Sequence, residues 1–325
     1  MTMLRSRIIG LGSFLPDRIS TNDDMAKIVD TSDEWIVTRT GIRQRHFADE
    51  GMSSSYMATK AAEEALKMAG ITGNDLDLIV LGTVTPDKTF PATAVYVQAA
   101  LGMEHGCAFD VVAACSGFLY ALRTADNMLR MGQAKTALVI GVETLSRITD
   151  FTDRNTCVLF GDGAGCAVLR AEESNGTSDD RGVIDTLIYS DGRYAPELCS
   201  TGGPSTNHDV GYITMNGREV FRHAAVNMAD ASEEILAKNG ISLDQVDWLI
   251  PHQANSRILE ATAKRLGISM EKVISTVGEH ANTSAASIPL ALSESYKSGK
   301  IKEGDLLLLP GMGAGFTWGA SLIRL

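Results

Sequence analysis

The sequence predicts a layered α/β fold that is built from two copies of one unit. Residues 61–80 and 231–250 align without a gap at an offset of 170. The apolar runs at 77–82, 136–143 and 305–311 do not alternate with polar residues, which is typical of strands buried on both faces. Helices that cover both faces of such sheets produce a layered α/β architecture.

Each copy of the first repeat predicts the same order of elements. An amphipathic helix is expected to end at Gly70 or Gly240, because the left-handed position after a helix favours glycine. A short polar turn follows, and an apolar strand is then expected at 76–81 and at 246–250. Chance similarity is the alternative explanation of this pairing.

A second pairing relates residues 113–132 to 280–299 at an offset of 167. Both segments are expected to be helices entered through small polar residues, and each is followed by a strand, at 136–140 and 305–309. Cys115 then falls opposite Asn282, so the two helix N-termini are expected to face a shared seam. The polar stretch 172–181 is the expected join, which gives an N-terminal half at 1–174 and a C-terminal half at 175–325.

The composition argues against several classes of function. A net charge of −11 does not favour binding to nucleic acid or to an anionic membrane. No apolar run approaches the roughly 20 residues of a membrane-spanning helix, and no signal peptide is expected. The five cysteines are irregularly spaced and form no CxxC pair, so neither a zinc site nor a disulfide framework is indicated. We therefore expect a cytoplasmic protein.

Cys115 is the candidate nucleophile. In DVVAACSGFLYAL (110–122), an apolar segment runs into the cysteine and an apolar-periodic helix follows, with small neighbours that leave room for a substrate. The positive end of the helix dipole is expected to lower the pKa of the thiol and raise its thiolate fraction. The alternative is a buried structural cysteine. That is our interpretation of Cys107, Cys157, Cys166 and Cys199.

His252 and Asn282 are candidate partners of this cysteine. His252 follows the strand expected at 246–250, and side chains at strand ends line crevices in α/β folds. Asn282 is either a helix N-cap or, through its pairing with Cys115, a functional residue. Cysteine, histidine and asparagine could form a cysteine protease, or histidine and asparagine could be two neutral donors that stabilise an enolate. These three residues alone do not decide between the two.

Six motifs resemble those of the β-ketoacyl-acyl carrier protein synthase III family, the initiating condensing enzymes of bacterial fatty-acid synthesis in the thiolase superfamily. They are TSDEWIVTRTGIRQRH (31–46), ACSGFLYAL (114–122), FGDGAG (160–165), PHQAN (251–255), NTSAAS (282–287) and GFTWG (315–319). The resemblance spans essentially the whole chain and makes a protease a remote alternative. It implies a duplicated five-layer αβαβα fold, a homodimer and decarboxylative Claisen condensation.

The resemblance also implies roles for the candidate residues. Cys115 would be acylated by acetyl-CoA or a related primer, and malonyl-acyl carrier protein would then lose carbon dioxide while His252 and Asn282 hold the enolate oxygen. The N–H groups of Cys115 and Ala314 would bind the oxyanion, with no metal and no cofactor beyond the acyl-CoA substrate. The alternatives are a related acyltransferase, a thioesterase or a ketosynthase of secondary metabolism. A binding protein without activity is disfavoured because the cysteine and histidine are both present.

Binding residues are implied by matched positions. The positions for CoA are Trp35 and Arg154 at the adenine, Arg39 near the phosphates and Asn255 at the pantetheine arm. Those for the acyl pocket are Phe90, which would reach into the pocket of the partner subunit, and Met312. Those for docking of the acidic carrier protein are Arg257, Lys264 and Arg265, which share one face of the helix expected at 256–267. A solvated helix face is the alternative for these three charges.

Two departures from the family pattern concern the backbone. Ala314 replaces the middle residue of a run of three glycines, and Ala281 stands before Asn282 where glycine is usual. If the position of Ala314 requires a positive φ, alanine adds strain there.

Overall fold

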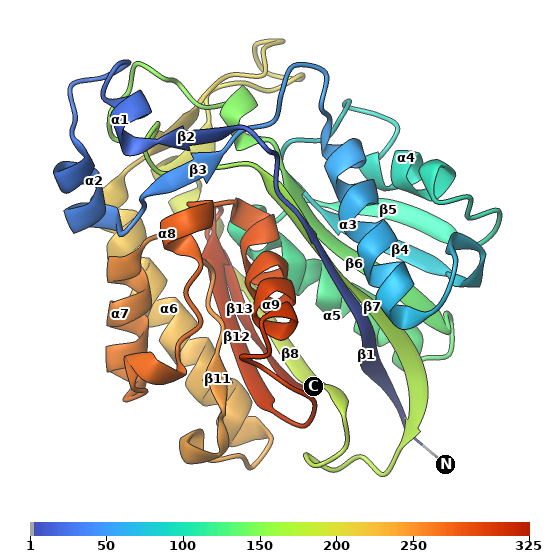
Figure 1. The fold of residues 1–325 in the computed structure, drawn as a ribbon. Coiled ribbons are helices and arrows are strands. Elements are labelled where there is room, and N and C mark those ends of the chain that lie inside the picture. The colour runs from blue at the N-terminus through green and yellow to red at the C-terminus, as the bar shows by residue number, and fades with distance from the viewer. Residues whose placement is uncertain (1–2) are drawn as a thin grey trace.

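Two mixed sheets form the framework of the computed structural model, which describes residues 3–325 (Figure 1). The first sheet has the order β1-β7-β6-β4-β5, and the second has the order β11-β12-β13-β8. The strands of the first are β1 (Met3–Phe14), β4 (Leu78–Gly82), β5 (Cys107–Val111), β6 (Thr136–Glu143) and β7 (Gly163–Ser174). Those of the second are β8 (Gly182–Ser190), β11 (Trp248–Leu249), β12 (Leu306–Gly313) and β13 (Thr317–Arg324).

The two sheets share one topology, which confirms the predicted duplication. In the first, β1 pairs antiparallel with β7, β7 antiparallel with β6, and β6 parallel with β4. In the second, β8, β13, β12 and β11 repeat these three pairings in the same order and sense. The predicted cap glycines agree as well, because Gly70 and Gly240 both take left-handed conformations, with φ of 66° and 63°.

Helices complete the five predicted layers (Figure 1). α3 (Ser54–Ala69) and α4 (Thr93–Ala100) cover the outer face of the first sheet, while α6 (Gly217–Lys238) and α7 (Ser256–Leu266) cover that of the second. α5 (Gly117–Arg130) and α9 (Ser287–Lys297) lie between the sheets. Each interface between layers buries its own apolar core, which accounts for the unalternated strands.

The remaining elements surround the ends of the sheets. They are β2 (Ile19–Thr21), β3 (Gln44–His46), β9 (Leu198–Ser200), β10 (Ile213–Met215), α1 (Asn22–Met25), α2 (Asp33–Thr40) and α8 (Val277–His280). Short 3-10 turns connect them at η1 (Gly73–Asp75), η2 (Ala114–Ser116), η3 (Leu145–Arg147), η4 (Gly192–Glu197), η5 (Leu243–Gln245), η6 (Met270–Lys272) and η7 (Ser284–Ala286). None of the helices described between residues 3 and 325 is long and apolar enough to cross a membrane.

Several predicted boundaries differ from the structure. The strand expected at 76–81 is Leu78–Gly82, and the strand expected at 246–250 is only Trp248–Leu249, shortly after the 3-10 turn η5. The helix expected to begin at Cys115 instead begins with the 3-10 turn η2, and α5 starts at Gly117. The cysteine therefore lies in a tight turn immediately before the α-helix.

The middle helices touch the strands through their backbones. A Cβ added to Gly141 of β6 would overlap the carbonyl oxygen of Ala285 in η7. At Gly82, where β4 ends, an added Cβ would lie 2.7 Å from the carbonyl carbon of Gly117, the first residue of α5. Glycine at these crossings lets the two helix N-termini sit directly against the first sheet.

We expect Gly141→Ala to lower the free energy of unfolding by about 1–3 kcal/mol or more, because the added methyl has no space in a core of this density. Urea denaturation followed by tryptophan fluorescence measures the change. Gly192→Ala is the matched control, because nothing lies within 4 Å of its added Cβ, and it should stay within about 0.5 kcal/mol of wild type. Equal midpoints for both variants would contradict the close crossing.

Candidate active site

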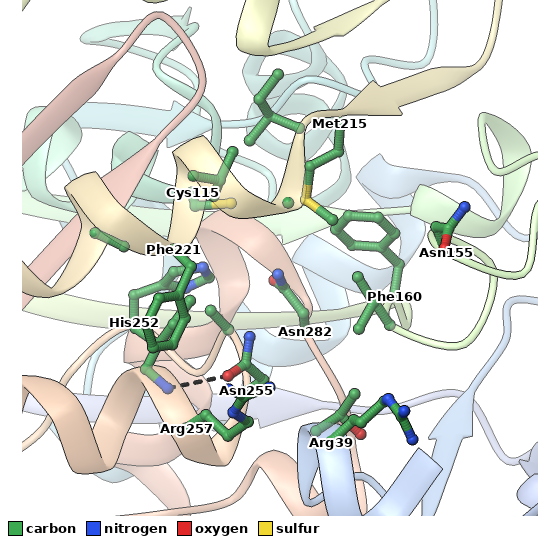
Figure 2. A pocket seen from close by; sticks show the side chains of 18 of the residues that line it. Arg39, Cys115, Asn155, Phe160, Met215, Phe221, His252, Asn255, Arg257 and Asn282 are labelled. Atoms are coloured by element: carbon green, nitrogen blue, oxygen red, sulfur yellow. Dashed lines mark hydrogen bonds between the residues drawn. The ribbon is translucent and has the colours of Figure 1, made fainter. Parts of the chain in front are cut away.

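Cys115, His252 and Asn282 line a single cavity of about 580 Å³. Figure 2 shows their side chains directed into the same space, although they come from η2, from the segment after β11 and from the segment before η7. The three residues are separated widely in the sequence. The duplication brings them together, because the equivalent helices α5 and α9 meet between the sheets.

The turn at Cys115 is held by an unusual backbone conformation. Ala114 takes a positive φ of 45°, which is uncommon for a residue with a Cβ. Gly313 crosses so closely that a Cβ on it would lie 2.5 Å from the Cys115 nitrogen. The N–H groups of Cys115 and Ala314 donate no hydrogen bond to the rest of the described chain. Both are therefore free to bind a ligand oxygen.

The thiol and the imidazole are both uncharged near neutral pH. Burial raises the pKa of Cys115 to about 12, although the neighbouring Ser284 side chain opposes this shift. The expectation of a lowered pKa is therefore wrong, because burial and the charge of Glu143 disfavour the thiolate more than the neighbouring Ser284 and backbone N–H favour it. Burial also lowers the pKa of His252 to about 3. The imidazole is consequently a neutral hydrogen-bonding group.

His252 is oriented by the start of α9. Its backbone N–H donates to the carbonyl of Pro310, and its Nδ1 lies 2.7 Å from the hydroxyl of Ser287. The N–H of Gln253 donates to the same hydroxyl oxygen, which leaves the hydroxyl proton for Nδ1. In this arrangement the imidazole proton is on Nε2, the nitrogen left for the cavity.

Asn282 is fixed by its backbone and by its own side chain. Its N–H donates to Leu159, and its carbonyl accepts from Gly161. Its Oδ1 accepts from the N–H of Ser284 at 2.8 Å, so the amide nitrogen Nδ2 is left as a donor. Asn282 is not the N-cap of α9, since that position is Ala286.

The predicted CoA residues form a cluster at the mouth of the cavity. The guanidinium carbons of Arg39 and Arg154 lie 4.5 Å and 5.1 Å from the centroid of the Trp35 ring. Trp35, Arg39 and Asn255 line the cavity, and Arg154 stands beside the lining residues. Asn255 also caps α7, because its Oδ1 accepts from the N–H of Ile258 at 3.0 Å (Figure 2).

The three predicted docking residues are exposed on α7, but they differ in their contacts. Arg257 lines the cavity mouth, with its guanidinium carbon 5.5 Å from the centroid of the Phe221 ring. Arg265 pairs with Asp230 at 2.7 Å. The buried side of α7 is mainly apolar, since Ile258, Leu259 and Leu266 pack inward.

A smaller cavity of about 200 Å³ adjoins Cys115. Its lining is mainly apolar: Val84, Leu145, Ile148, Phe160, Leu198, Val210 and Ile213. Met312 lines the larger cavity instead, and the side chain of Phe90 is 81% exposed and lines neither. Leu198 and Ile213 could not be predicted as lining residues, because the segment around them lacks periodicity. Phe160 could have been found within the FGDGAG motif.

The two departures have opposite outcomes. Ala314 does not have a positive φ, so the backbone strain considered for this position is absent. The positive φ, 128°, belongs to Gly315. Ala281 has φ of 58° and ψ of −160°, a region used almost only by glycine. Ala281 and Ala114 precede the paired residues Asn282 and Cys115, and both are left-handed. The second repeat pairing therefore holds at the level of the backbone.

Comparisons with known proteins agree with this geometry. The family model for 3-oxoacyl-[acyl-carrier-protein (ACP)] synthase III matches residues 109–192, and the model for its C-terminal part matches residues 236–325. The β-ketoacyl-[acyl-carrier-protein] synthase III of Paramagnetospirillum magneticum is 58% identical over 323 residues, which cover 99% of this chain and 100% of that protein.

Solved structures extend the agreement to the fold. The 3-oxoacyl-[acyl-carrier-protein] synthase III of Aquifex aeolicus matches with a TM-score of 0.93 at 48% identity, covering 98% of this chain and 100% of that one. The priming β-ketosynthase of the R1128 polyketide biosynthetic pathway has a TM-score of 0.93 at 32% identity, covering 100% of this chain and 97% of that one. The chain belongs to the β-ketoacyl-[acyl-carrier-protein] synthase III family.

Proposed function

We propose that the protein is a β-ketoacyl-acyl carrier protein synthase III that initiates fatty-acid synthesis. It would take an acyl group from an acyl-CoA primer, which we expect to be acetyl-CoA, and condense it with malonyl-acyl carrier protein. The observation that carries the proposal is the convergence of Cys115, His252 and Asn282 on one cavity. The names of its relatives support the same reaction.

In the first half-reaction the sulfur of Cys115 attacks the carbonyl carbon of the primer thioester. The negative charge on the carbonyl oxygen is held by the N–H groups of Cys115 and Ala314, which have no other acceptor in the described chain. Collapse of this intermediate releases CoA as a thiol and leaves an acyl group on Cys115. The mainly apolar cavity of about 200 Å³ beside the sulfur favours a short primer.

In the second half-reaction malonyl thioester loses carbon dioxide and becomes an enolate. We assign the enolate oxygen to Nε2–H of His252 and Nδ2–H of Asn282. A neutral imidazole suits this role, and the low pKa of His252 keeps it neutral. The carbanion carbon then attacks the acyl carbon on Cys115, the sulfur leaves as a thiolate, and a proton taken up from solvent restores the thiol for another cycle. No step in this sequence requires a metal or a separate cofactor.

The CoA residues are assigned from their arrangement at the cavity mouth. The guanidinium groups of Arg39 and Arg154 both lie over the Trp35 ring. With CoA bound, the indole would stack on one face of the adenine and Arg154 on the other face of the adenine. Arg39 would then reach the CoA phosphates. The Nδ2 of Asn255 would contact the pantetheine arm. The Oδ1 of Asn255 would still accept from the N–H of Ile258, so α7 would keep its N-cap hydrogen bond.

We propose that the protein acts as a cytoplasmic homodimer. The side chain of Phe90 is 81% exposed and would be available to a second subunit, where the partner's Phe90 would close the acyl pocket; Met312 would then border the acyl group from the larger cavity. We divide each subunit at residues 174 and 175, between β7 and β8. The first half then supplies the nucleophile, and the second supplies His252 and Asn282.

A ketosynthase of secondary metabolism is the second candidate. It is favoured by the similarity to the R1128 priming β-ketosynthase, whose TM-score equals that of the Aquifex aeolicus protein. Incubation with a panel of acyl-CoAs, followed by product analysis with malonyl-acyl carrier protein, separates the two. Exclusive use of acetyl-CoA would support initiation of fatty-acid synthesis, and preference for a longer primer would support the second candidate.

We expect acetyl-CoA to add one acyl group to the protein and Cys115→Ala to abolish both this labelling and condensation. The reason is that Cys115 is the only cysteine that lines the larger cavity. Mass spectrometry of the intact protein, followed by peptide mapping, locates the label. Cys166→Ala is the control, since that buried thiol lines neither cavity. An acyl group on Cys107 or Cys166 would contradict the assignment.

We expect His252→Ala and Asn282→Ala each to slow the decarboxylation of malonyl thioester by roughly 100- to 1000-fold, about 3 kcal/mol, by analogy with the loss of one oxyanion donor. Acylation of Cys115 should survive at least partly, because it needs neither donor. Release of labelled carbon dioxide measures the first step and mass spectrometry the second. If Asn282→Ala decarboxylated malonyl thioester at the normal rate, the role of the Asn282 amide would be only to support the turn at Ser284.

We expect Arg257→Glu to raise the KM for malonyl-acyl carrier protein while acylation by acetyl-CoA stays nearly unchanged. The acidic carrier would lose a cation at the cavity mouth, and the effect should shrink as salt rises, since exposed charges are screened over about 8–10 Å. Steady-state kinetics at two ionic strengths tests this. Lys67→Glu on α3 makes the same charge change on the opposite outer layer and serves as control. Equal loss of both half-reactions would refute the docking role.

A further inference from the structure

The side chain of Glu143 lies behind the active site and has no part in the reaction described above. It ends β6 and is fully buried. All its hydrogen-bond partners are uncharged donors: the hydroxyls of Thr83, Thr85 and Ser284 at 3.2, 2.7 and 3.1 Å, and the N–H of Val84 at 3.1 Å. Such a ring of donors favours the carboxylate form of a buried acid.

Ser284 connects this carboxyl group to the active site. Its hydroxyl donates to Oε1 of Glu143, and its side chain lines the smaller cavity together with Cys115. The Ser284 side chain also acts on the pKa of the Cys115 thiol, in the direction that favours the thiolate. Ser284 also holds a left-handed φ of 48°, an uncommon conformation for a residue with a Cβ. One hydroxyl therefore stands between a buried carboxyl and the nucleophile.

We propose that Glu143 receives the Cys115 proton during acylation, through the hydroxyl of Ser284. The S–H bond breaks as the sulfur attacks the thioester carbonyl, the proton passes to Ser284 Oγ, and the proton of that hydroxyl passes to Oε1 of Glu143. When the intermediate collapses, the proton returns along the same path to the departing CoA sulfur. Glu143 touches neither substrate nor sulfur, so it is a positioning residue. This proposal rests on the proposed acylation of Cys115.

The alternative acceptor is His252, and two observations disfavour it. Burial raises the pKa of Glu143 to about 7, whereas it lowers that of His252 to about 3. Near neutral pH the carboxylate is therefore the stronger base. In addition, Nδ1 of His252 is occupied by Ser287, and Nε2 carries the proton that would serve the enolate. The two proton-handling groups would then serve different half-reactions.

The test compares wild type with Glu143→Gln, Ser284→Ala and the double variant. Rapid quench and mass spectrometry of the intact protein give the rate of acylation by acetyl-CoA. We expect each single variant to lose about 100-fold in this rate, a magnitude typical of one proton acceptor, and the double variant to lose no more. Decarboxylation of malonyl thioester should change less than about threefold. Glutamine keeps the shape of Glu143, so a packing role would be rescued by Glu143→Gln.

Asp162→Asn is the matched control. Asp162 is another fully buried carboxyl that accepts only from uncharged donors, the N–H groups of Ala48 and Ser146 and the Ser146 hydroxyl. Its loss should lower the unfolding temperature but leave the acylation rate of folded protein within about twofold, because that variant keeps both Ser284 and Glu143. Acylation by Glu143→Gln at the wild-type rate, or an equal loss of both half-reactions, would overturn the proposal.

Alkylation of Cys115 by iodoacetamide gives a second readout that needs no CoA. The charge of Glu143 raises the pKa of the Cys115 thiol. If Glu143 acted only through this charge, its removal would lower the thiol pKa and speed alkylation. Removal of a proton acceptor would slow it, and we expect slower alkylation in Glu143→Gln. Faster alkylation would overturn the proposal. If no acyl-CoA labels the wild type but alkylation still slows, the proposed condensation fails while the proton path stands.

Discussion

The close backbone contact between the middle helices and the strands is the constraint on which the site depends. Gly141 admits the carbonyl of Ala285, Gly82 admits the start of α5, and Gly313 passes against the nitrogen of Cys115. Each contact requires a residue without a side chain, and together they fix the two helix N-termini within the seam between the sheets. The positions of the nucleophile and of Asn282 are therefore set by backbone packing, which is stiffer than any side-chain contact.

A second theme is the separation of charge between the interior and the rim. Around Cys115 the thiol and imidazole are neutral, and the one acidic group, Glu143, is surrounded by hydroxyls and an N–H. The cations lie at the mouth, where Arg39 and Arg257 stack on aromatic rings. On a chain with a net charge of −11, these cations make the rim locally favourable to an anionic ligand. The low dielectric of the buried surroundings strengthens each hydrogen bond offered to the reacting oxygens.

Periodicity and spacing were sufficient to predict the duplicated layers, the helix caps and the pairing of Cys115 with Asn282. They failed where the outcome depends on distant contacts. The thiol pKa is set by burial from both halves, and nothing local to DVVAACSGFLYAL reveals that burial. Likewise the left-handed angle of Ala281 is imposed by its surroundings, since alanine alone would avoid it. Residues such as Leu198 reach the cavity from an aperiodic segment and carried no signal.

The order of the strands also governs how the chain can be made. In each sheet the strand that comes last in the sequence, β7 or β13, is inserted between the first strand and the others. During synthesis β1 can pack against α3, but it has no strand partner until residues 163–174 have left the ribosome, a wait of roughly ten seconds at the usual rate of elongation. β8 waits in the same way for β13. A strand without its partner is thus exposed at two stages in the synthesis of each chain. These are the stages at which a chaperone is most useful.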